Sequence, residues 1–334
     1  MNAFLACGVA GPALDRDERR VLEEVGPAGI VLFGRNVVEH DQLLDLVAEL
    51  RRLPSTPYVA IDLEGGRVNR LETLIGPLPS GAQAARAGSK AVCALGESAG
   101  AACAHFGIGV DFAPVADVAR QGGFLASESR CLGATPAEAR KGGAAFLEGL
   151  ASFGVAGCLK HYPGLGSGTV DSHRELPTLG ESVHADVEVF HALAATGRAV
   201  MVAHALAPPL GEGSLPATLS RTVVGRVRDV AAPILADDLE MGALAAFGSL
   251  AQRASAALAA GCDQVLLCNA LAARREVTEH VRDVARQDRA FASALVQGSE
   301  RLGGFGHAEL RQVGWGEVMR LAERARHAAA EGDG

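Results

Sequence analysis

The chain of 334 residues is 49% hydrophobic and 21% charged, as is typical of a soluble globular protein with a sizeable core. Its formal net charge of −8 argues against nucleic acid as the main partner. No apolar stretch approaches the roughly 20 residues of a membrane span, so we expect no membrane partner.

The seven cysteines are scattered and include no C-x-x-C pair, a pattern typical of reduced thiols in a reducing compartment. The first residues lack the basic region and the long apolar region of a secretory signal. These features predict a cytoplasmic protein, and we expect it to be a monomer.

Short apolar runs alternate with helical patterns along most of the chain. The runs that we predict as buried strands are 4–7, 29–33, 58–61, 108–112, 155–159, 199–202, 234–236 and 265–268. Helical patterns occur at 15–25, 41–53, 82–106, 136–153, 184–195 and 250–259. Eight strands alternating with helices predict an α/β fold, a single (β/α)8 TIM-like barrel, with a doubly wound open sheet as the alternative.

The absence of an interdomain linker predicts one barrel domain over residues 1–334, with a helical and then disordered tail from about residue 305. Polar residues closely follow six of the eight runs: Asn36, Asp62, Lys160 with His161, His204, Asp237 with Asp238, and Asn269. The C-terminal strand ends of a barrel meet on one face, where active sites are built. The placement of these residues therefore favours the barrel over the open sheet.

The segment 160–173 is the most informative part of the chain. Two potentially cationic side chains, Lys160 and His161, precede a Pro/Gly-rich loop that ends on Asp171 and His173. A carboxylate that orients an imidazole is a common proton-transfer group near neutral pH. The alternative is a phosphate-binding loop, but its glycines lack the G-x-G-x-x-G spacing and lead into no helix. A lone loop histidine is usually just solvated, so the prediction of chemistry depends on the four residues together.

A turn with paired glycines follows the run at 58–61 and carries Asp62 and Arg70. A strand-end aspartate can accept protons from two sugar hydroxyls, and arginine is a rigid donor of several hydrogen bonds. Arg130, in the segment after the fourth run, has the same potential. The alternative for these residues is an ordinary surface ion pair.

Asp237 and Asp238 directly follow the apolar run at 234–236. Two adjacent carboxylates at the end of a buried strand are costly unless they are paired or used. Neighbouring residues point in different directions. We therefore predict that Asp237 reaches the site, while Asp238 caps a helix that begins near Leu239 or braces the structure.

These motifs resemble those of the bacterial β-N-acetylglucosaminidases of glycoside hydrolase family 3. The resemblance rests on residues 62–70, Arg130, Lys160-His161-Tyr162-Pro163-Gly164, Asp171-Ser172-His173 and 237–241, which match in order along nearly the whole chain. Segments 29–36, 111–118 and 215–220 are similar as well. The string Lys-His-Tyr-Pro-Gly followed by Asp-Ser-His is highly specific for this group.

The resemblance implies removal of terminal β-linked N-acetylglucosamine with retention of configuration, from peptidoglycan-derived fragments. It implies Asp237 as the nucleophile and His173, held by Asp171, as the general acid/base. The sugar hydroxyls would be bound by Asp62, Arg70, Arg130, Lys160 and His161. The resemblance implies a small sugar as the partner and neither a metal nor an organic cofactor.

Three residues depart from the family pattern: Leu165 stands where a second histidine is frequent, Leu63 where glutamine is usual and Ala236 where serine is usual. None of these differences removes a catalytic group. Leu165 makes the loop less polar, which bears on the preference for the leaving group.

Four alternatives are compatible with the same residues. A glycoside phosphorylase on this scaffold would use phosphate in place of water. A histidine acid/base repels the incoming phosphate less than a carboxylate would. A Schiff-base aldolase would use Lys160 as its nucleophile. A sugar-binding barrel would lack catalysis, and a metal site would draw on His161, Asp171 and His173, whose spacing matches no standard ligand pattern.

Overall fold

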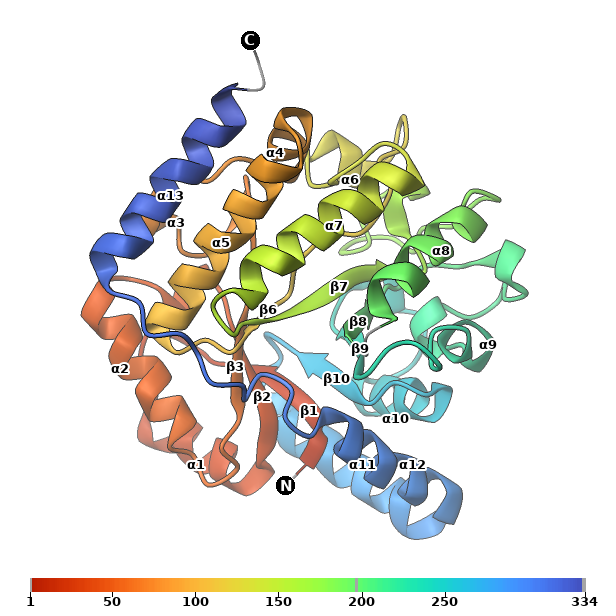
Figure 1. Cartoon of the computed structure of the whole chain (residues 1–334). Coiled ribbons are helices and arrows are strands. Elements are labelled where there is room, and N and C mark those ends of the chain that lie inside the picture. The colour runs from red at the N-terminus through yellow and green to blue at the C-terminus, as the bar shows by residue number, and fades with distance from the viewer. Residues whose placement is uncertain (1, 196–197, 332–334) are drawn as a thin grey trace.

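The computed structural model describes residues 2–195 and 198–331, and within them eight parallel strands close into a barrel (Figure 1). The strands are β1 (Asn2–Gly8), β2 (Pro27–Leu32), β3 (Tyr58–Ile61), β6 (Val110–Asp111), β7 (Ala156–Tyr162), β8 (Ala199–Val202), β9 (Ile234–Asp238) and β10 (Gln264–Leu267). Their order around the barrel is β1, β10, β9, β8, β7, β6, β3, β2. The predicted (β/α)8 TIM-like barrel is confirmed, and the open sheet is wrong because β1 pairs with both β10 and β2.

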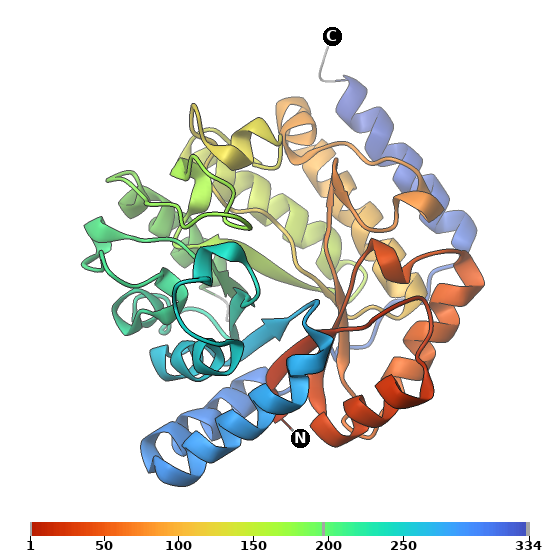
Figure 2. The same cartoon turned by 180° about the vertical axis from the view of Figure 1, so that it is seen from behind.

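Helices cover the outside of the barrel (Figures 1 and 2). They are α1 (Arg16–Val25), α2 (His40–Arg51), α3 (Glu72–Ile75), α4 (Gly81–Ala87), α5 (Ser89–Phe106), α6 (Phe124–Ser127), α7 (Pro136–Ala151), α8 (Val183–Ala194), α9 (Arg221–Gly225), α10 (Leu250–Ala260), α11 (Arg274–Gln287), α12 (Arg289–Leu302) and α13 (Trp315–Ala330). The single helix predicted at 82–106 is two helices, because Gly88, at a φ of +99°, separates α4 from α5.

Two barrel strands extend further than predicted. Lys160 and His161 lie within β7 and not after it, and Asp237 and Asp238 are the last residues of β9. Lys160 exchanges backbone hydrogen bonds with Pro114 and Ala116 in the segment after β6, and Asp238 is paired with Leu266 of β10. The His161 amide donates to the Asp117 side chain. These contacts make the positions more rigid than those of loop residues.

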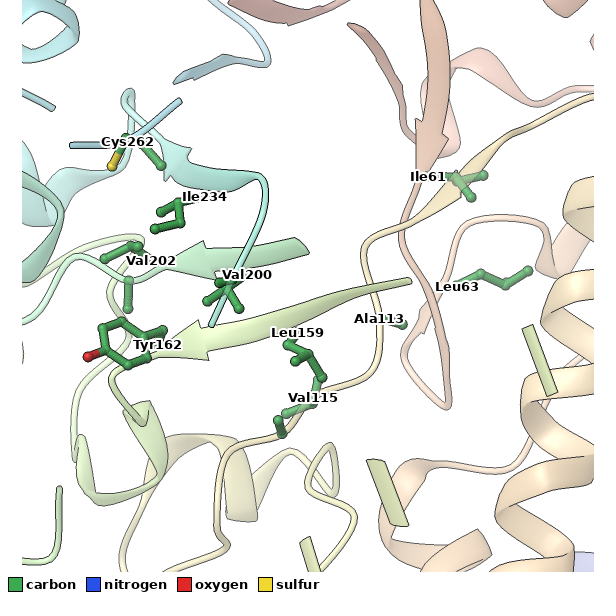
Figure 3. Packing of buried hydrophobic residues seen from close by; sticks show 14 of the residues in the cluster. Ile61, Leu63, Ala113, Val115, Leu159, Tyr162, Val200, Val202, Ile234 and Cys262 are labelled. Carbon is green, nitrogen blue, oxygen red and sulfur yellow. The ribbon is translucent and has the colours of Figure 1, made fainter. Parts of the chain in front are cut away.

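Alternate residues of the barrel strands face the interior and the surrounding helices, as the pleat of a strand requires. Residues such as Val31 and Met201 belong to a small buried cluster inside the barrel. Their strand neighbours, such as Ile61, Leu159 and Val200, belong to a larger cluster under the helices (Figure 3). This alternation explains why the strand sequences read as continuous apolar runs.

The C-terminal part of the chain covers the N-terminal end of the barrel and part of its outer side. Phe305 packs against Tyr58 at the N-terminal end of β3, with ring centroids 5.2 Å apart. The helix α13 packs along α5 and α4 (Figure 1), and Arg326 donates hydrogen bonds to the carbonyls of Ile75 and Pro77. Residues 332–334, at the end of the tail that was predicted to be helical and then disordered from about residue 305, lie outside the described residues. In the part of the chain that the structure describes, none of the helices is long and apolar enough to cross a membrane.

Asp111 links the barrel to the hairpin formed by β4 (Leu63–Gly65) and β5 (Val68–Asn69). Its fully buried side chain accepts a hydrogen bond of 2.9 Å from the Leu63 amide through Oδ1. Burial raises the pKa of Asp111 from the ordinary 3.8 to about 8, although the Leu63 amide and Lys160 oppose this shift. The carboxyl group is therefore protonated at neutral pH.

We expect Asp111→Asn to keep the hydrogen bond from Leu63 and to remove an ionisable group. In the wild type the unfolded chain loses this proton near pH 3.8 and the folded chain only near pH 8, so stability falls as the pH rises between these values. The variant should match the wild type at about pH 4 and exceed its free energy of unfolding by ~5 kcal/mol at about pH 8, since one unit of pKa shift corresponds to about 1.4 kcal/mol. Denaturant unfolding across this range measures the difference, and a difference that does not change with pH would contradict the protonated state.

Candidate active site

A pocket of about 340 Å³ opens at the C-terminal ends of the barrel strands. All eight residues predicted for the site line it: Asp62, Arg70, Arg130, Lys160, His161, Asp171, His173 and Asp237. They come from β7, β9 and four separate loops or turns. The structure therefore brings together residues that are up to 175 positions apart, Asp62 and Asp237 being the two outermost in sequence.

Four charged side chains form one wall of the pocket. Lys160 Nζ lies 2.6 Å from Asp62 Oδ1 and 2.6 Å from Glu64 Oε1. Arg130 forms a two-point ion pair with Glu64, with Nε–Oε2 and Nη2–Oε1 distances of 2.9 and 2.8 Å. The two cations and two carboxylates balance each other, so this wall can bind neutral hydroxyl groups without a net charge.

Glu64 and Lys160 are held in their charged forms. Burial alone would raise the pKa of Glu64, but Lys160 and Arg130 lower it well below its usual value. Burial likewise acts to lower the pKa of Lys160, but Asp62 and Glu64 raise it well above the usual value. Lys160 is thus a permanent ammonium group, which removes the lone pair that a Schiff-base aldolase needs.

The β4–β5 hairpin places Glu64 and Arg70 at the pocket. Gly65 and Gly66, at φ of +90° and +55°, form its turn in a region that disfavours side chains. A Cβ on Gly65 would also lie 2.3 Å from the carbonyl oxygen of Pro79. The paired glycines in the sequence are therefore required both by backbone conformation and by close packing.

His161 is oriented by a buried carboxylate that the sequence analysis did not identify. Its Nδ1 lies 2.7 Å from Asp117 Oδ2, which also accepts the His161 amide at 2.9 Å. The other oxygen of Asp117 accepts the Leu165 amide at 2.5 Å. Since a carboxylate only accepts, Nδ1 carries a proton and Nε2 faces the pocket, 3.5 Å from Arg130 Nη2.

Leu165, which departs from the family pattern, is buried in the outer core cluster. It begins the short helix η2 (Leu165–Ser167) at the start of the loop that carries Asp171. Its side chain therefore anchors the base of the loop and does not line the pocket in this structure.

Asp237 lies at the end of β9 and faces the pocket, as predicted. Burial acts to raise its pKa, but the neighbouring His161 and Lys160 side chains and the Asp238 amide bring the pKa below its usual value. The Asp238 amide donates to Asp237 Oδ1 at 2.8 Å. Asp237 is therefore an oriented, ionised carboxylate.

Asp238 braces the structure and caps no α-helix, since none begins near Leu239 in the described chain. Its Oδ1 accepts the amides of Glu240 at 3.2 Å and Cys268 at 3.4 Å. Burial and the charge of Glu240 raise the pKa of Asp238 to about 7. Below that pH, Asp237 is the charged member of this adjacent pair.

The predicted Asp171–His173 pair is formed at the mouth of the pocket. Asp171 Oδ1 lies 2.8 Å from His173 Nδ1 and accepts the His173 amide at 3.0 Å. Burial acts to raise the pKa of Asp171, but its hydrogen bonds with His173 lower it below the usual value. The ionised Asp171 keeps the proton on Nδ1, which leaves Nε2 available for another partner. The His173 side chain is 68% exposed.

The backbone of this loop is hydrogen-bonded to the segment that follows β9. The amides of Gly242 and Ala243 donate to the carbonyls of His173 and Ser172, at 2.9 and 3.2 Å. The loop therefore has a defined position relative to β9, even though the imidazole itself is exposed.

Arg70 lines the pocket, and its guanidinium lies 5.9 Å from the centre of the Phe33 ring. Its Nε is buried and has no hydrogen-bond partner among the residues that the structure describes. A buried donor without a partner is costly, so a ligand that accepts from Arg70 would relieve this cost. At the rim, Arg67 and Glu128 form an ion pair across the pocket mouth.

Three of the strand-end polar residues do not line the pocket. Asn36 is buried and donates to the carbonyls of Val9 and Gly11, and Asn269 accepts from Arg35. His204 is buried behind β9. Their position at the strand ends was predicted correctly, but their side chains serve the structure of the surrounding loops.

Glu64 and Asp117 are the functional residues that the sequence analysis missed. Glu64 lies two residues after Asp62, and Asp117 is, with Asp111, one of two carboxylates within the otherwise apolar segment 110–118. A carboxylate in an apolar segment requires a buried partner, and this rule was the available signal. Within residues 2–195 and 198–331, no three or more His, Cys, Asp or Glu side chains are placed to hold a metal ion.

The glycosyl hydrolase family 3 N-terminal domain matches residues 5–301 of this chain. A beta-hexosaminidase from Methylococcus capsulatus is 34% identical over 284 residues, which cover 81% of this chain and 84% of that protein. The structure of a family 3 β-N-acetylglucosaminidase from Paenibacillus has a TM-score of 0.87 at 26% identity, covering 98% of this chain and 68% of that one. NagZ from Neisseria gonorrhoeae, solved with N-trifluoroacetyl-D-glucosamine, has a TM-score of 0.78 at 27% identity and covers 99% of this chain and 96% of that one. The barrel, the charged pocket and these matches agree: the chain belongs to glycosyl hydrolase family 3.

Proposed function

We propose that the protein is a retaining exo-β-N-acetylglucosaminidase that forms a covalent glycosyl intermediate on Asp237. The observation that carries the proposal is one pocket with an ionised, oriented carboxylate at its floor and an Asp171–His173 pair at its mouth. A retaining glycosidase needs a nucleophile on one side of the sugar ring and a proton donor near the leaving oxygen.

The size and lining of the pocket support a single terminal sugar as the group that is bound. Its volume of about 340 Å³ is at the small end of the range for ligand pockets. The wall formed by Asp62, Glu64, Lys160 and Arg130 offers both donors and acceptors, which suits sugar hydroxyls. The names of the relatives favour N-acetylglucosamine as this sugar, and peptidoglycan-derived fragments are the source that we propose.

In the first step, the Asp237 carboxylate attacks the anomeric carbon while the glycosidic C–O bond breaks. His173 donates its Nε2 proton to the leaving oxygen, and Asp171 stabilises the imidazole through Nδ1. The charged wall holds the non-reacting hydroxyls, and this remote binding helps to stabilise the transition state.

In the second step, His173 Nε2 removes a proton from water, which attacks the anomeric carbon and releases Asp237. Two displacements restore the starting configuration. The same imidazole therefore acts first as acid and then as base, a role that most glycosidases give to a carboxylic acid.

The released sugar tests the reaction as a whole. With a panel of aryl β-glycosides that differ at the 2-position, we expect preference for the 2-acetamido sugar and free β-N-acetylglucosamine as the first product, followed over time by NMR. Added phosphate should leave the product unchanged. A sugar phosphate would instead show a phosphorylase, and an α-anomer as first product would contradict retention.

Asp237→Asn should lower kcat by ~10³-fold or more while N-acetylglucosamine still binds, because the lost interaction acts in the transition state. A 2-fluoro glycoside should label Asp237 in the wild type, as found by peptide mass spectrometry. Asp238→Asn is the matched control, since the side-chain oxygen of asparagine can still accept the hydrogen bonds from the backbone N–H groups of Glu240 and Cys268. A label on Asp238 would contradict the assignment.

His173→Ala should slow the cleavage of a disaccharide by ~10²–10⁴-fold, since a sugar leaving group needs a proton. A nitrophenyl group leaves without a proton, so the formation of the glycosyl-enzyme from a nitrophenyl glycoside should change far less. The released nitrophenol should then appear as a burst. Azide, which needs no base, should then speed the second step. The control His184→Ala removes an exposed histidine outside this pocket and should have no effect. Equal losses on both substrates without an azide effect would make His173 a binding residue.

A further inference from the structure

His204 is a buried histidine that follows β8 and lies next to the nucleophile strand without lining the pocket. Both of its ring nitrogens have close partners. Nδ1 lies 2.7 Å from the Thr218 hydroxyl oxygen, and Nε2 lies 2.9 Å from the carbonyl oxygen of Asp238. Strands β8 and β9, which these contacts connect, are adjacent in the barrel (Figure 1).

The partners determine which nitrogen of the ring carries the proton. A carbonyl oxygen can only accept, so Nε2 is protonated and donates to Asp238. Burial lowers the pKa of His204 below its usual value, although the charge of Asp237 opposes this effect, and the ring is therefore neutral. Nδ1 is then an acceptor, and it shares the single hydroxyl proton of Thr218 with the Ala203 carbonyl, whose oxygen lies 2.7 Å from the same hydroxyl oxygen.

The backbone of Asp238 connects this imidazole to the carboxylate that reacts. Its carbonyl accepts from His204, while its amide donates to Asp237 Oδ1 at 2.8 Å. The amide and the carbonyl of Asp238 belong to two peptide planes that meet at its Cα, so the bond from His204 holds one plane and thereby limits the movement of the other. The Thr218 hydroxyl is therefore connected to the Asp237 side chain by hydrogen bonds on either side of the Asp238 Cα.

Thr218 itself is fixed by its surroundings. It is fully buried in the short helix η4 (Ala217–Leu219), within the Leu215–Ser220 part of the chain that resembles the family. The Ala217 amide donates to the Ala205 carbonyl at 2.8 Å, which ties η4 to the end of β8. None of these residues lines the pocket, so direct sugar binding does not account for this motif.

We propose that Thr218 and His204 are positioning residues that set the direction of the Asp237 carboxylate through the backbone of Asp238. The inference rests on the proposed role of Asp237 as the nucleophile. Misdirection of a nucleophile affects the transition state much more than the bound sugar. The expected signature is thus a slower chemical step with unchanged binding.

The test compares Thr218→Val, which keeps the shape but removes the hydroxyl, with Thr218→Ser, which keeps it. We expect Thr218→Val to lower the rate of covalent labelling by a 2-fluoro glycoside by ~10-fold or more, with the Kd of N-acetylglucosamine within about twofold of the wild type. Thr218→Ser should restore most of the rate. His204→Gln, which offers a donor and an acceptor, should also retain more of the rate than His204→Leu.

Ser220→Ala is the matched control, because Ser220 caps α9 two residues further along and has no hydrogen bond to His204. It should lower the melting temperature without lowering the labelling rate. Equal labelling rates for Thr218→Val and Thr218→Ser would overturn the inference, as would an equal loss in Ser220→Ala. A wild-type label on a residue other than Asp237 would instead overturn the proposed function, so the two failures are distinguishable.

Discussion

The candidate site depends on the mutual neutralisation of four charges that have little contact with water. Lys160 and Glu64 are 3% and 5% exposed, and an isolated charge at such a position would cost several kcal/mol. Each charge is stable only because the others are in place. Since Asp62 and Glu64 come from the turn after β3, Lys160 from β7 and Arg130 from the segment after α6, their ion pairs also hold three distant parts of the chain in register.

The fold was largely predictable because each barrel strand is buried on both faces, which produces a continuous apolar run with a polar residue at its end. The limits of the strands were less predictable. Lys160 and Asp237 are charged, so the sequence pattern ended the strands before them, whereas β7 and β9 continue through both residues. Local composition cannot show that a charged residue has a buried partner of opposite charge on a distant part of the chain.

The same limit applies to the site residues. The strand-end rule identified the face of the barrel on which Asp62, His204 and Asn269 lie, but not the direction of their side chains. That direction depends on strand twist and on the loops packed behind each strand, which are long-range features. Glu64 and Asp117 were missed for the related reason that their partners, Lys160 and His161, are 96 and 44 positions away in sequence.

The exposure of the His173 ring affects how the imidazole exchanges protons with the solvent during repeated turnover. In the proposed reaction the imidazole gives one proton to the leaving group and takes one from water, so each turnover leaves its proton count unchanged. Only a ring that has lost or gained a proton between turnovers must exchange one with the solvent. Because the ring is in contact with bulk water, this exchange needs no relay of buried groups or internal waters. The floor of the pocket around Asp237 can therefore exclude solvent while the proposed acid/base still exchanges protons with it. Buffer molecules have direct access to the His173 imidazole.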